Sequence, residues 1–363
     1  SSDCGTLACG LSDGLVRLHL LKEGAPPKKK KTKLPAATTD ATDVAADAAP
    51  ASDIAAGSAN PATASAGSVA AAGSGAAAAA TTNDAEAALA AEAASTPPAD
   101  IVTLRGHSGP VYGVSFSRDS LFLLSCSQDG TVRNWGVAQR ACLVCYLAHS
   151  CPVWNVVFAP LGSSFATCAY DRTVRLWTVA QMQPTRIFKG HLADVRCCCF
   201  HPNLSMIASG SDDLSIRIWD VRDAKCVRIL SRDGHSAAVS CITICNFGDL
   251  LASGGEDGAA LLWRLSSGQL LQRLRAHTAP VWSVGFSQES SQLLTGSADC
   301  SLAVWDMIAA AATDAAPAEV GSRGERFLIS RLFTRDTPLV VARYSRTNLI
   351  MGAGAYQPQF GTA

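Results

Sequence analysis

One spacing of polar and aromatic residues recurs five times in the middle of this 363-residue chain. A histidine is followed 22 positions later by an aspartate, and a tryptophan stands six positions after the aspartate. A serine or threonine also stands four positions before each aspartate. The five sets are His107, Ser125, Asp129 and Trp135; His149, Thr167, Asp171 and Trp177; His191, Ser209, Asp213 and Trp219; His235, Ser253, Asp257 and Trp263; and His277, Thr295, Asp299 and Trp305. Because successive sets are offset by 42, 42, 44 and 42 residues, the middle of the chain repeats one structural unit.

Each unit carries the pattern of four short β-strands, with turn residues every ten or so positions. In the third unit, the expected strands are 195–200, 206–211, 214–219 and 226–230. A period of about 40–45 residues, with Gly-His near the start and Trp near the end, is typical of a WD-repeat β-propeller. We therefore predict an all-β, seven-bladed WD-repeat propeller whose first and last blades are incomplete in this chain, with a disordered insertion.

The rest of the chain divides around these repeats. The expected segments are a partial first blade at 1–21, a disordered Ala-rich insertion at 22–100, WD-repeat blades at 101–308, a low-complexity loop at 309–324 and closing strands at 325–363. The insertion has few large apolar side chains and cannot bury enough surface to offset its ordering entropy. In the first blade, Cys9 and His19 replace the hydroxyl and the tryptophan of a full set. The chain begins with Ser, and we expect it to be a fragment of a larger protein.

The four residues of each set are expected to form a buried hydrogen-bonded tetrad that is structural. Positions four apart on a strand share a face, so the hydroxyl, histidine, aspartate and tryptophan can meet. Serine, histidine and aspartate are also the members of a hydrolase triad. Five equivalent copies favour a structural module instead, because an active site needs only one. We predict no enzymatic activity and no cofactor.

Composition excludes several other classes. The chain has 30 basic and 30 acidic residues, so its zero net charge gives no support to phosphate-driven, sequence-specific nucleic-acid binding. No apolar run is long enough for a membrane span. Most of the 14 cysteines fall at strand positions, where free Cys acts as a small apolar residue. Cys142 and Cys145 have a zinc-like spacing, but no second pair accompanies them, and we predict no metal site.

Two further segments suggest interactions. A lysine run within the insertion resembles a nuclear-import signal, although a solvated charge cluster in a linker is an equal alternative; it comprises Lys28, Lys29, Lys30, Lys31 and Lys33. In the repeats, the residues five positions after each histidine and one before each aspartate should reach one rim of the propeller. Aromatic residues and Arg dominate interaction hot spots. We therefore predict an aromatic-basic partner-binding patch formed by Tyr112, Trp154, Tyr170, Arg196 and Trp282.

The closing segment resembles a narrower family than WD repeats in general. Its pieces Thr337-Pro338-Leu339-Val340-Val341, Arg346-Thr347-Asn348-Leu349 and Gly352-Ala353-Gly354-Ala355-Tyr356 are similar to the end of the WD-repeat TBP-associated factor, number five, of general transcription factor TFIID. Segments 106–113, 152–154 and 190–202 resemble its Gly-His segments. His19, the Asn134-Trp135-Gly136 sequence and the long insertion depart from that family, and its amino-terminal helical domains are absent here.

This resemblance implies a nuclear scaffold that packs against histone-fold TBP-associated factors in TFIID and helps to assemble the RNA polymerase II preinitiation complex. The same or a sister subunit serves the SAGA coactivator. An alternative is a substrate receptor of a cullin-RING ubiquitin ligase, because Trp219-Asp220-Val221-Arg222 resembles the WD-x-Arg box of such receptors. A splicing or microtubule-associated WD protein would share the Gly-His segments but would not explain the closing segment.

Overall fold

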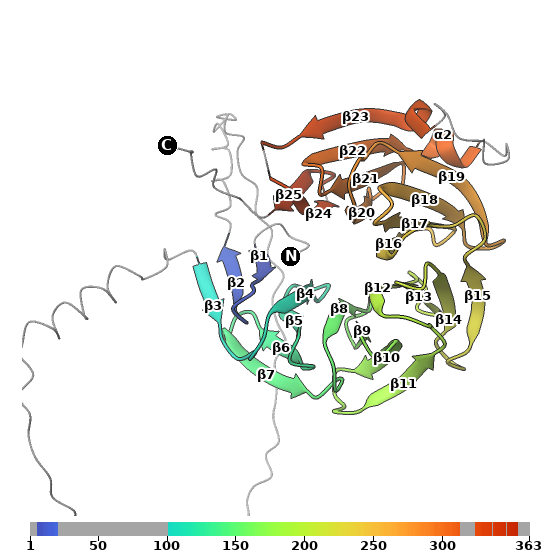
Figure 1. Cartoon of the computed structure of the whole chain (residues 1–363). Coiled ribbons are helices and arrows are strands. Elements are labelled where there is room, and N and C mark those ends of the chain that lie inside the picture. The colour runs from blue at the N-terminus through green and yellow to red at the C-terminus, as the bar shows by residue number, and fades with distance from the viewer. Residues whose placement is uncertain (1–5, 21–100, 313–323, 336, 346, 355–363) are drawn as a thin grey trace, which may run out of the picture. The chain divides into compact units, whose positions relative to one another are not determined.

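The computed structural model describes residues 6–20, 101–312, 324–335, 337–345 and 347–354 (Figure 1). The chain divides into two units, 24–96 and the remainder, and every described residue belongs to the second of these. The predicted insertion at 22–100 and its lysine run lie outside the described residues.

The described strands form seven antiparallel sheets. The first sheet contains β1 (Thr6–Gly10), β2 (Val16–Leu20) and β3 (Ile101–Leu104). Five four-stranded sheets follow: β4 (Val111–Phe116), β5 (Phe122–Ser127), β6 (Val132–Gly136), β7 (Ala141–Tyr146); β8 (Val153–Phe158), β9 (Ser164–Ala169), β10 (Thr173–Thr178), β11 (Pro184–Lys189); β12 (Val195–Phe200), β13 (Met206–Ser211), β14 (Ile216–Asp220), β15 (Cys226–Leu230); β16 (Val239–Ile244), β17 (Leu250–Gly255), β18 (Ala259–Arg264), β19 (Gln269–Arg275); and β20 (Val281–Phe286), β21 (Gln292–Ser297), β22 (Ser301–Asp306), β23 (Leu328–Phe333). The last sheet pairs β24 (Leu339–Tyr344) with β25 (Ile350–Gly354).

Successive sheets contact one another through their first strands. β4, β8, β12, β16, β20 and β24 touch in that order, and the sheets follow one another around a common centre (Figure 1). This arrangement confirms the predicted all-β propeller architecture. The first sheet has three described strands and the last has two, whereas each sheet between them has four.

The turn between the second and third strands explains one difference from the predicted strands. The residue after the aspartate has a positive φ in this turn, as at Gly130 (77°), Arg172 (63°) and Leu214 (65°). An extended strand cannot include such a residue. The third strand of the third unit therefore begins at Ile216, two residues later than predicted, while the other three strands of that unit have the predicted bounds.

The hydrophobic core lies between neighbouring sheets. The five tetrad tryptophans are at most 2% exposed, and each buried cluster joins side chains from adjacent sheets. Burial of side chains of this size is the main favourable contribution to folding.

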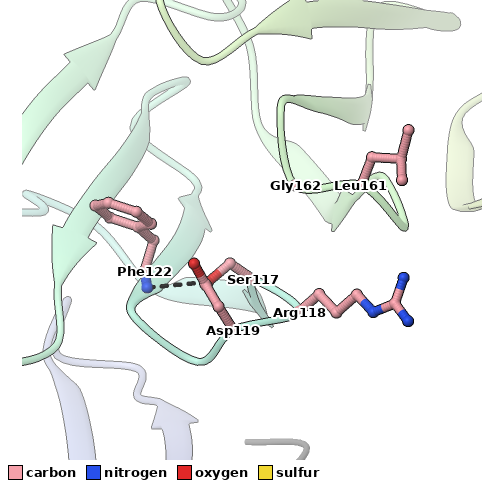
Figure 2. A pocket seen from close by; sticks show the side chains of 6 residues that line it. All are labelled: Ser117, Arg118, Asp119, Phe122, Leu161 and Gly162. Atoms are coloured by element: carbon pink, nitrogen blue, oxygen red, sulfur yellow. Dashed lines mark hydrogen bonds between the residues drawn. The ribbon is translucent and has the colours of Figure 1, made fainter. Parts of the chain in front are cut away.

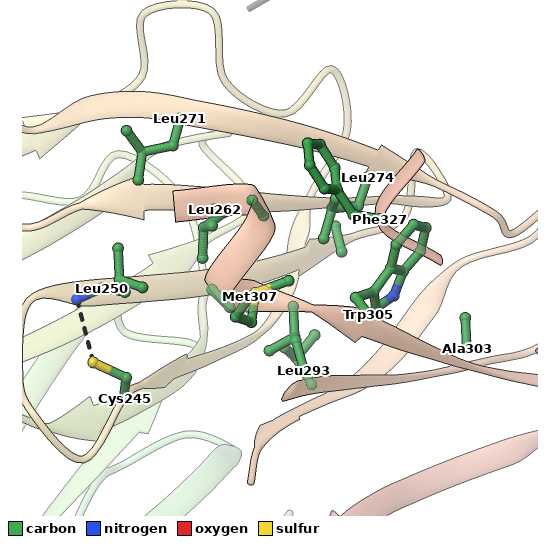
Figure 3. Close-up of a cluster of buried hydrophobic side chains, with 14 of the residues drawn as sticks. Cys245, Leu250, Leu262, Leu271, Leu274, Leu293, Ala303, Trp305, Met307 and Phe327 are labelled. Carbon is green, nitrogen blue, oxygen red and sulfur yellow. Dashed lines mark hydrogen bonds between the residues drawn. The ribbon is translucent and has the colours of Figure 1, made fainter. Parts of the chain in front are cut away.

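The segment between β22 and β23 differs from the loop predicted at 309–324. Helix α2 (Met307–Ala312) follows β22, and the 3₁₀-helix η1 (Gly324–Phe327) precedes β23. Met307, Ala310 and Phe327 are buried against Leu271 and Leu274 of the preceding sheet (Figure 3). The loop prediction is wrong at 309–312 because small residues there complete a helix that covers the groove between two sheets. Neither helix in the described part is long and apolar enough to cross a membrane.

Candidate functional site

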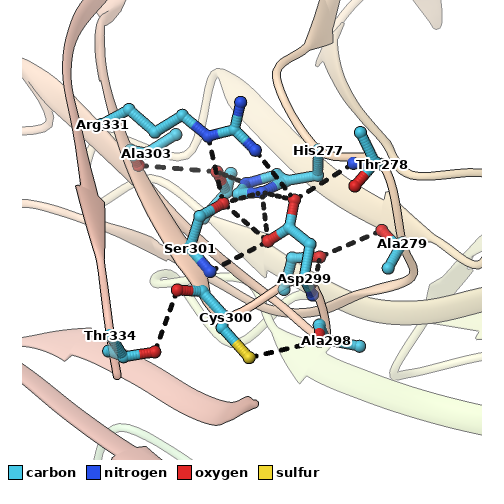
Figure 4. Close-up of polar contacts among 12 residues, drawn as sticks. His277, Thr278, Ala279, Ala298, Asp299, Cys300, Ser301, Ala303, Arg331 and Thr334 are labelled. Carbon is cyan, nitrogen blue, oxygen red and sulfur yellow. Dashed lines mark hydrogen bonds and ion pairs between the residues drawn. The ribbon is translucent and has the colours of Figure 1, made fainter. Parts of the chain in front are cut away.

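The structure places the four side chains of each set within hydrogen-bond distance. The tryptophan Nε1 lies 2.7–3.0 Å from the serine or threonine oxygen. That oxygen lies 2.7–2.9 Å from the histidine Nε2. The histidine Nδ1 lies 2.7–3.2 Å from an aspartate oxygen. Figure 4 shows the fifth of these sets, around His277 and Asp299.

The donors fix the direction of this chain of hydrogen bonds. An indole N–H can only donate, so the hydroxyl accepts from the tryptophan and donates to the histidine Nε2. The neutral histidine then donates its Nδ1–H to the carboxylate. The five hydroxyls are 0% exposed, so no substrate atom can reach them. The arrangement therefore ties the entry to each first strand to the next turn and does not present a nucleophile.

The tetrads shift the pKa of their acids and bases. Burial alone would raise the pKa of Asp129, but hydrogen bonds from Thr131, Ser108 and His107 outweigh it and lower this pKa to about 2. The pKa values of the other four tetrad aspartates are lowered in the same way. Burial lowers the pKa of His107, His149 and His277. Ionised aspartates and neutral histidines are thus the favoured forms.

Each tetrad also has an arginine that the sequence analysis missed. In the first three full sheets this arginine lies on the third strand, at Arg133, Arg175 and Arg217. In the next two sheets the same strand position holds Leu261 or Ala303, and the arginine comes from the residue paired with it on the fourth strand, Arg273 or Arg331. Every four-stranded sheet therefore supplies one arginine at this pair of positions.

These arginines connect the tetrad aspartate to the loop that precedes the histidine. Arg175 lies 2.9 Å from Asp171 and donates to the carbonyl of Ala148, the residue before His149, at 2.7 Å. Arg331 lies 3.1 Å from Asp299. A Cβ added at Gly106 or Gly190 would come within 2.8 Å of an arginine Nη1, which explains the glycine of these two Gly-His pairs. A comparison of third-strand and fourth-strand residues within the repeat could have found this pattern.

We expect the arginine to be movable between the two paired positions. Arg175→Leu should lower the free energy of unfolding by about 1–2 kcal/mol, because it removes charged hydrogen bonds to Asp171 and Ala148. Adding Ile187→Arg, at the residue paired with Arg175, should recover most of this loss. Urea unfolding of the two single variants and the double variant measures the coupling. Additive effects of the two substitutions would contradict the exchange.

The predicted partner positions at the rim have a common structural origin. Each first strand has a register shift against its neighbour at its second residue, which is Tyr112, Trp154, Arg196, Ser240 or Trp282. A β-bulge re-aims the side chain of the extra residue. Tyr112, Tyr170 and Trp282 are 43%, 56% and 41% exposed. Tyr112 also contacts Trp154, with ring centroids 4.8 Å apart.

The rim patch is not basic as predicted, because Arg196 is neutralised within the protein. Its guanidinium makes three hydrogen bonds of 2.9–3.0 Å to Asp212 and lies over the Trp154 ring at 4.9 Å. The structure thus brings Tyr112, Trp154 and Arg196 together in one contact series across β4, β8 and β12. No contact joins Tyr170 or Trp282 to that series among the described residues.

Other candidate features give less support for chemistry. Cys142 and Cys145 are unpaired, half-buried thiols, and burial raises the pKa of Cys241 to about 12. His149, Cys151 and Asp171 offer three ligand atoms within 4.8 Å, but both ring nitrogens of His149 already serve its tetrad. In the first sheet, His19 pairs with Leu7 and Cys9 with Arg17, so no tetrad bonds form there.

A shallow hollow of about 430 Å³ lies at the other ends of the strands, between the β4–β5 and β8–β9 hairpins. Its lining comprises Ser117, Arg118, Asp119, Phe122, Leu161 and Gly162 (Figure 2). Asp119 accepts hydrogen bonds from the Ser117 hydroxyl and the Leu121 amide, so its carboxylate stabilises the hairpin turn.

Comparisons with known proteins give matches over parts of the chain. It is 53% identical over 45 residues to the SAGA complex/transcription factor TFIID complex subunit Taf5 of Schizosaccharomyces pombe, which covers 12% of this chain and 7% of that protein. It is 40% identical over 74 residues to the angio-associated migratory cell protein of Homo sapiens, covering 20% and 17%. It is 33% identical over 72 residues to eukaryotic translation initiation factor 3 subunit I of Eremothecium gossypii, covering 20% and 21%. The matched segments thus span at most about a fifth of each relative.

A family model covers much more of the chain. The model described as WD domain, G-beta repeat matches residues 99–136, 140–178, 182–220, 224–264 and 268–306. These five segments make up more than half of the sequence, and each ends at or just after a tetrad tryptophan. With the repeated sheets and their tetrads, this match shows that the chain belongs to the WD40-repeat family.

Proposed function

We propose that this WD40-repeat protein is a non-enzymatic scaffold subunit of TFIID in the nucleus. The observation that carries the proposal is the 53% identity over 45 residues to the Taf5 subunit, together with the closing segment from Thr337 to Tyr356. The two other relatives described above share 40% and 33% identity over longer segments. Histone-fold TBP-associated factors are the proposed partners, and assembly of the RNA polymerase II preinitiation complex is the proposed role.

The geometry of the site supports a binding role over catalysis. WD40 domains mediate protein–protein interactions, and the polar groups that resemble a catalytic triad are sealed inside the five tetrads. The rim patch, by contrast, exposes Tyr112, Tyr170 and Trp282. Aromatic side chains of this kind supply most of the binding energy at many interfaces.

Affinity purification of the full chain from nuclear extract, followed by mass spectrometry, tests the proposal. Histone-fold TBP-associated factors and TBP should co-purify. The variant Tyr170→Ala/Trp282→Ala should reduce their recovery by at least about tenfold, as expected for loss of hot-spot residues. Val227→Ala/Ile229→Ala, on exposed residues of β15, serves as the control and should leave recovery unchanged. Absence of these factors would reject the TFIID assignment.

Two alternative complexes give different results in the same experiment. The printed name of the Taf5 relative includes the SAGA complex, so coactivator subunits without TBP would indicate a SAGA-type scaffold. A cullin-RING receptor is favoured by one observation: Arg222 is exposed in the turn after β14, and its amide donates to Asp220 at 2.7 Å. Recovery of a cullin adaptor that Arg222→Ala abolishes would support that alternative.

A further inference from the structure

The centre of the rim patch carries more negative than positive charge. Asp212 and Glu256 stand immediately before the tetrad aspartates of adjacent sheets, and the Asp212 amide donates to the Asp194 carbonyl at 2.9 Å. The charges of all three carboxylates act on Arg196 and, despite its burial, raise the pKa of its guanidinium. Only Asp212 bonds to that guanidinium.

The other two carboxylates have no protein partner of hydrogen-bond geometry among the described residues. The Trp154 indole N–H influences the pKa of Asp194, but this buried N–H does not reach any described acceptor at hydrogen-bond geometry. Arg172 also acts on Asp194, but it donates its hydrogen bond to the Leu192 carbonyl. Burial and the charge of Asp212 raise the pKa of Asp194, so a nearby cation would stabilise its ionised form. Glu256 is exposed beside this group.

We propose that the centre of the rim patch binds a cationic side chain, Arg or Lys, of a protein partner, with Asp194 and Glu256 as its ionic partners. Three carboxylates around two guanidinium groups leave one negative charge for that cation to neutralise. The exposed rings of Tyr112 and Trp282 lie on the same rim and offer apolar surface for the stem of such a side chain. This inference rests on the proposed binding role of the rim patch, but it does not depend on which complex the chain joins.

The chain offers a direct reporter for this interaction. It contains seven tryptophans, and only Trp154 and Trp282 lie outside the tetrads. Their two indole N–H signals in a ¹⁵N-correlated NMR spectrum would report on the rim patch, while the other five would report on folding. The probe is the peptide acetyl-Gly-Ala-Arg-Ala-Gly-amide, compared with the same peptide carrying lysine, neutral citrulline or glutamate at the central position.

The arginine and lysine peptides should shift the Trp154 or Trp282 signal, and the citrulline and glutamate peptides should bind at least about fivefold more weakly. Asp194→Asn and Glu256→Gln should each weaken binding of the arginine peptide by about threefold, as expected for accessible charge pairs. Asp233→Asn, at an exposed carboxylate of a neighbouring loop, is the control and should have no effect. Unchanged signals of the five tetrad tryptophans would show that each variant is folded.

Equal binding of the citrulline peptide, binding unaffected by Asp194→Asn and Glu256→Gln, or no shift with any peptide at about 20 mM would each overturn the cation inference. Recovery of TFIID subunits in the purification would still stand in those cases, because it does not depend on these peptides. Conversely, peptide binding without TFIID subunits would keep the cation site and reject the TFIID assignment.

Discussion

Asp213→Ala is expected to lower the free energy of unfolding by about 3–5 kcal/mol, as when one partner of a buried charged pair is removed. Its carboxylate accepts hydrogen bonds from the His191 ring, from the Leu192 and Ser215 amides and from the Ser215 hydroxyl, at 2.6–3.0 Å. Without it, the buried His191 Nδ1–H has no acceptor, and an unsatisfied buried donor is costly. Urea unfolding followed by tryptophan fluorescence measures the change.

Asp13→Ala is the matched control for this experiment. Asp13 occupies the equivalent turn of the first sheet, but its listed role there is limited to accepting a hydrogen bond from the Leu15 amide at 3.1 Å, in an exposed position. Because no histidine or tryptophan depends on Asp13, its replacement should cost less than about 1 kcal/mol. Similar losses in the two variants would mean that the turn, and not the tetrad, accounts for the effect of Asp213.

The repeat made the architecture predictable from the sequence. The 42-residue offsets locate equivalent strands, and the polar residues at fixed spacing locate the turns between them. The bounds of Val195–Phe200, Met206–Ser211 and Cys226–Leu230 could be derived because each strand is flanked by turn residues. The start at Ile216 could not, because Leu214 carries an apolar side chain while its backbone adopts a turn conformation.

Features that depend on pairing between strands were less accessible. The five arginines share no sequence offset, since two of them lie on the fourth strand, and only the register of Leu261 with Arg273 and of Ala303 with Arg331 makes them equivalent. The charge of the rim patch was predicted wrongly for the same reason. Asp212 lies 16 residues from Arg196, and their ion pair follows from the bulge in β12 and the next turn.

Helix α2 shows a second limit of pattern analysis. The sequence 307–312 is a run of small and apolar residues that also suits a low-complexity loop. Its helical form is stabilised by Met307 and Ala310, which pack against the preceding sheet. Short helices in water are only marginally stable without such contacts, so this helix could not be recognised without knowing its neighbour in space.

Acid is expected to destabilise this protein in two stages, and both have the same sign. The pKa values of His107, His149 and His277 are lower in the folded state than their ordinary value of 6.5. Below pH 6.5 the unfolded chain therefore binds more protons, so stability falls as pH decreases toward the folded-state values. The loss in this first stage should be gradual, because burial and the tetrad aspartates shift these pKa values in opposite directions.

The second stage should be much steeper, because the tetrad aspartates titrate. The pKa of Asp129 falls from 3.8 in the unfolded chain to about 2 in the folded protein, which corresponds to about 2 kcal/mol of stability that is present above pH 3.8 and lost as pH falls through 2. Five such carboxylates together match the whole stability of an ordinary domain, so unfolding should be complete before pH 2. Unfolding free energies measured by urea between pH 2 and 8, at constant ionic strength, test this expectation. In Asp213→Asn the slope near pH 3 should correspond to about one proton fewer, because one of the five acids is gone. A stability that stays constant or rises between pH 5 and 3 would show that the carboxylates are not held in their ionised form by the tetrads.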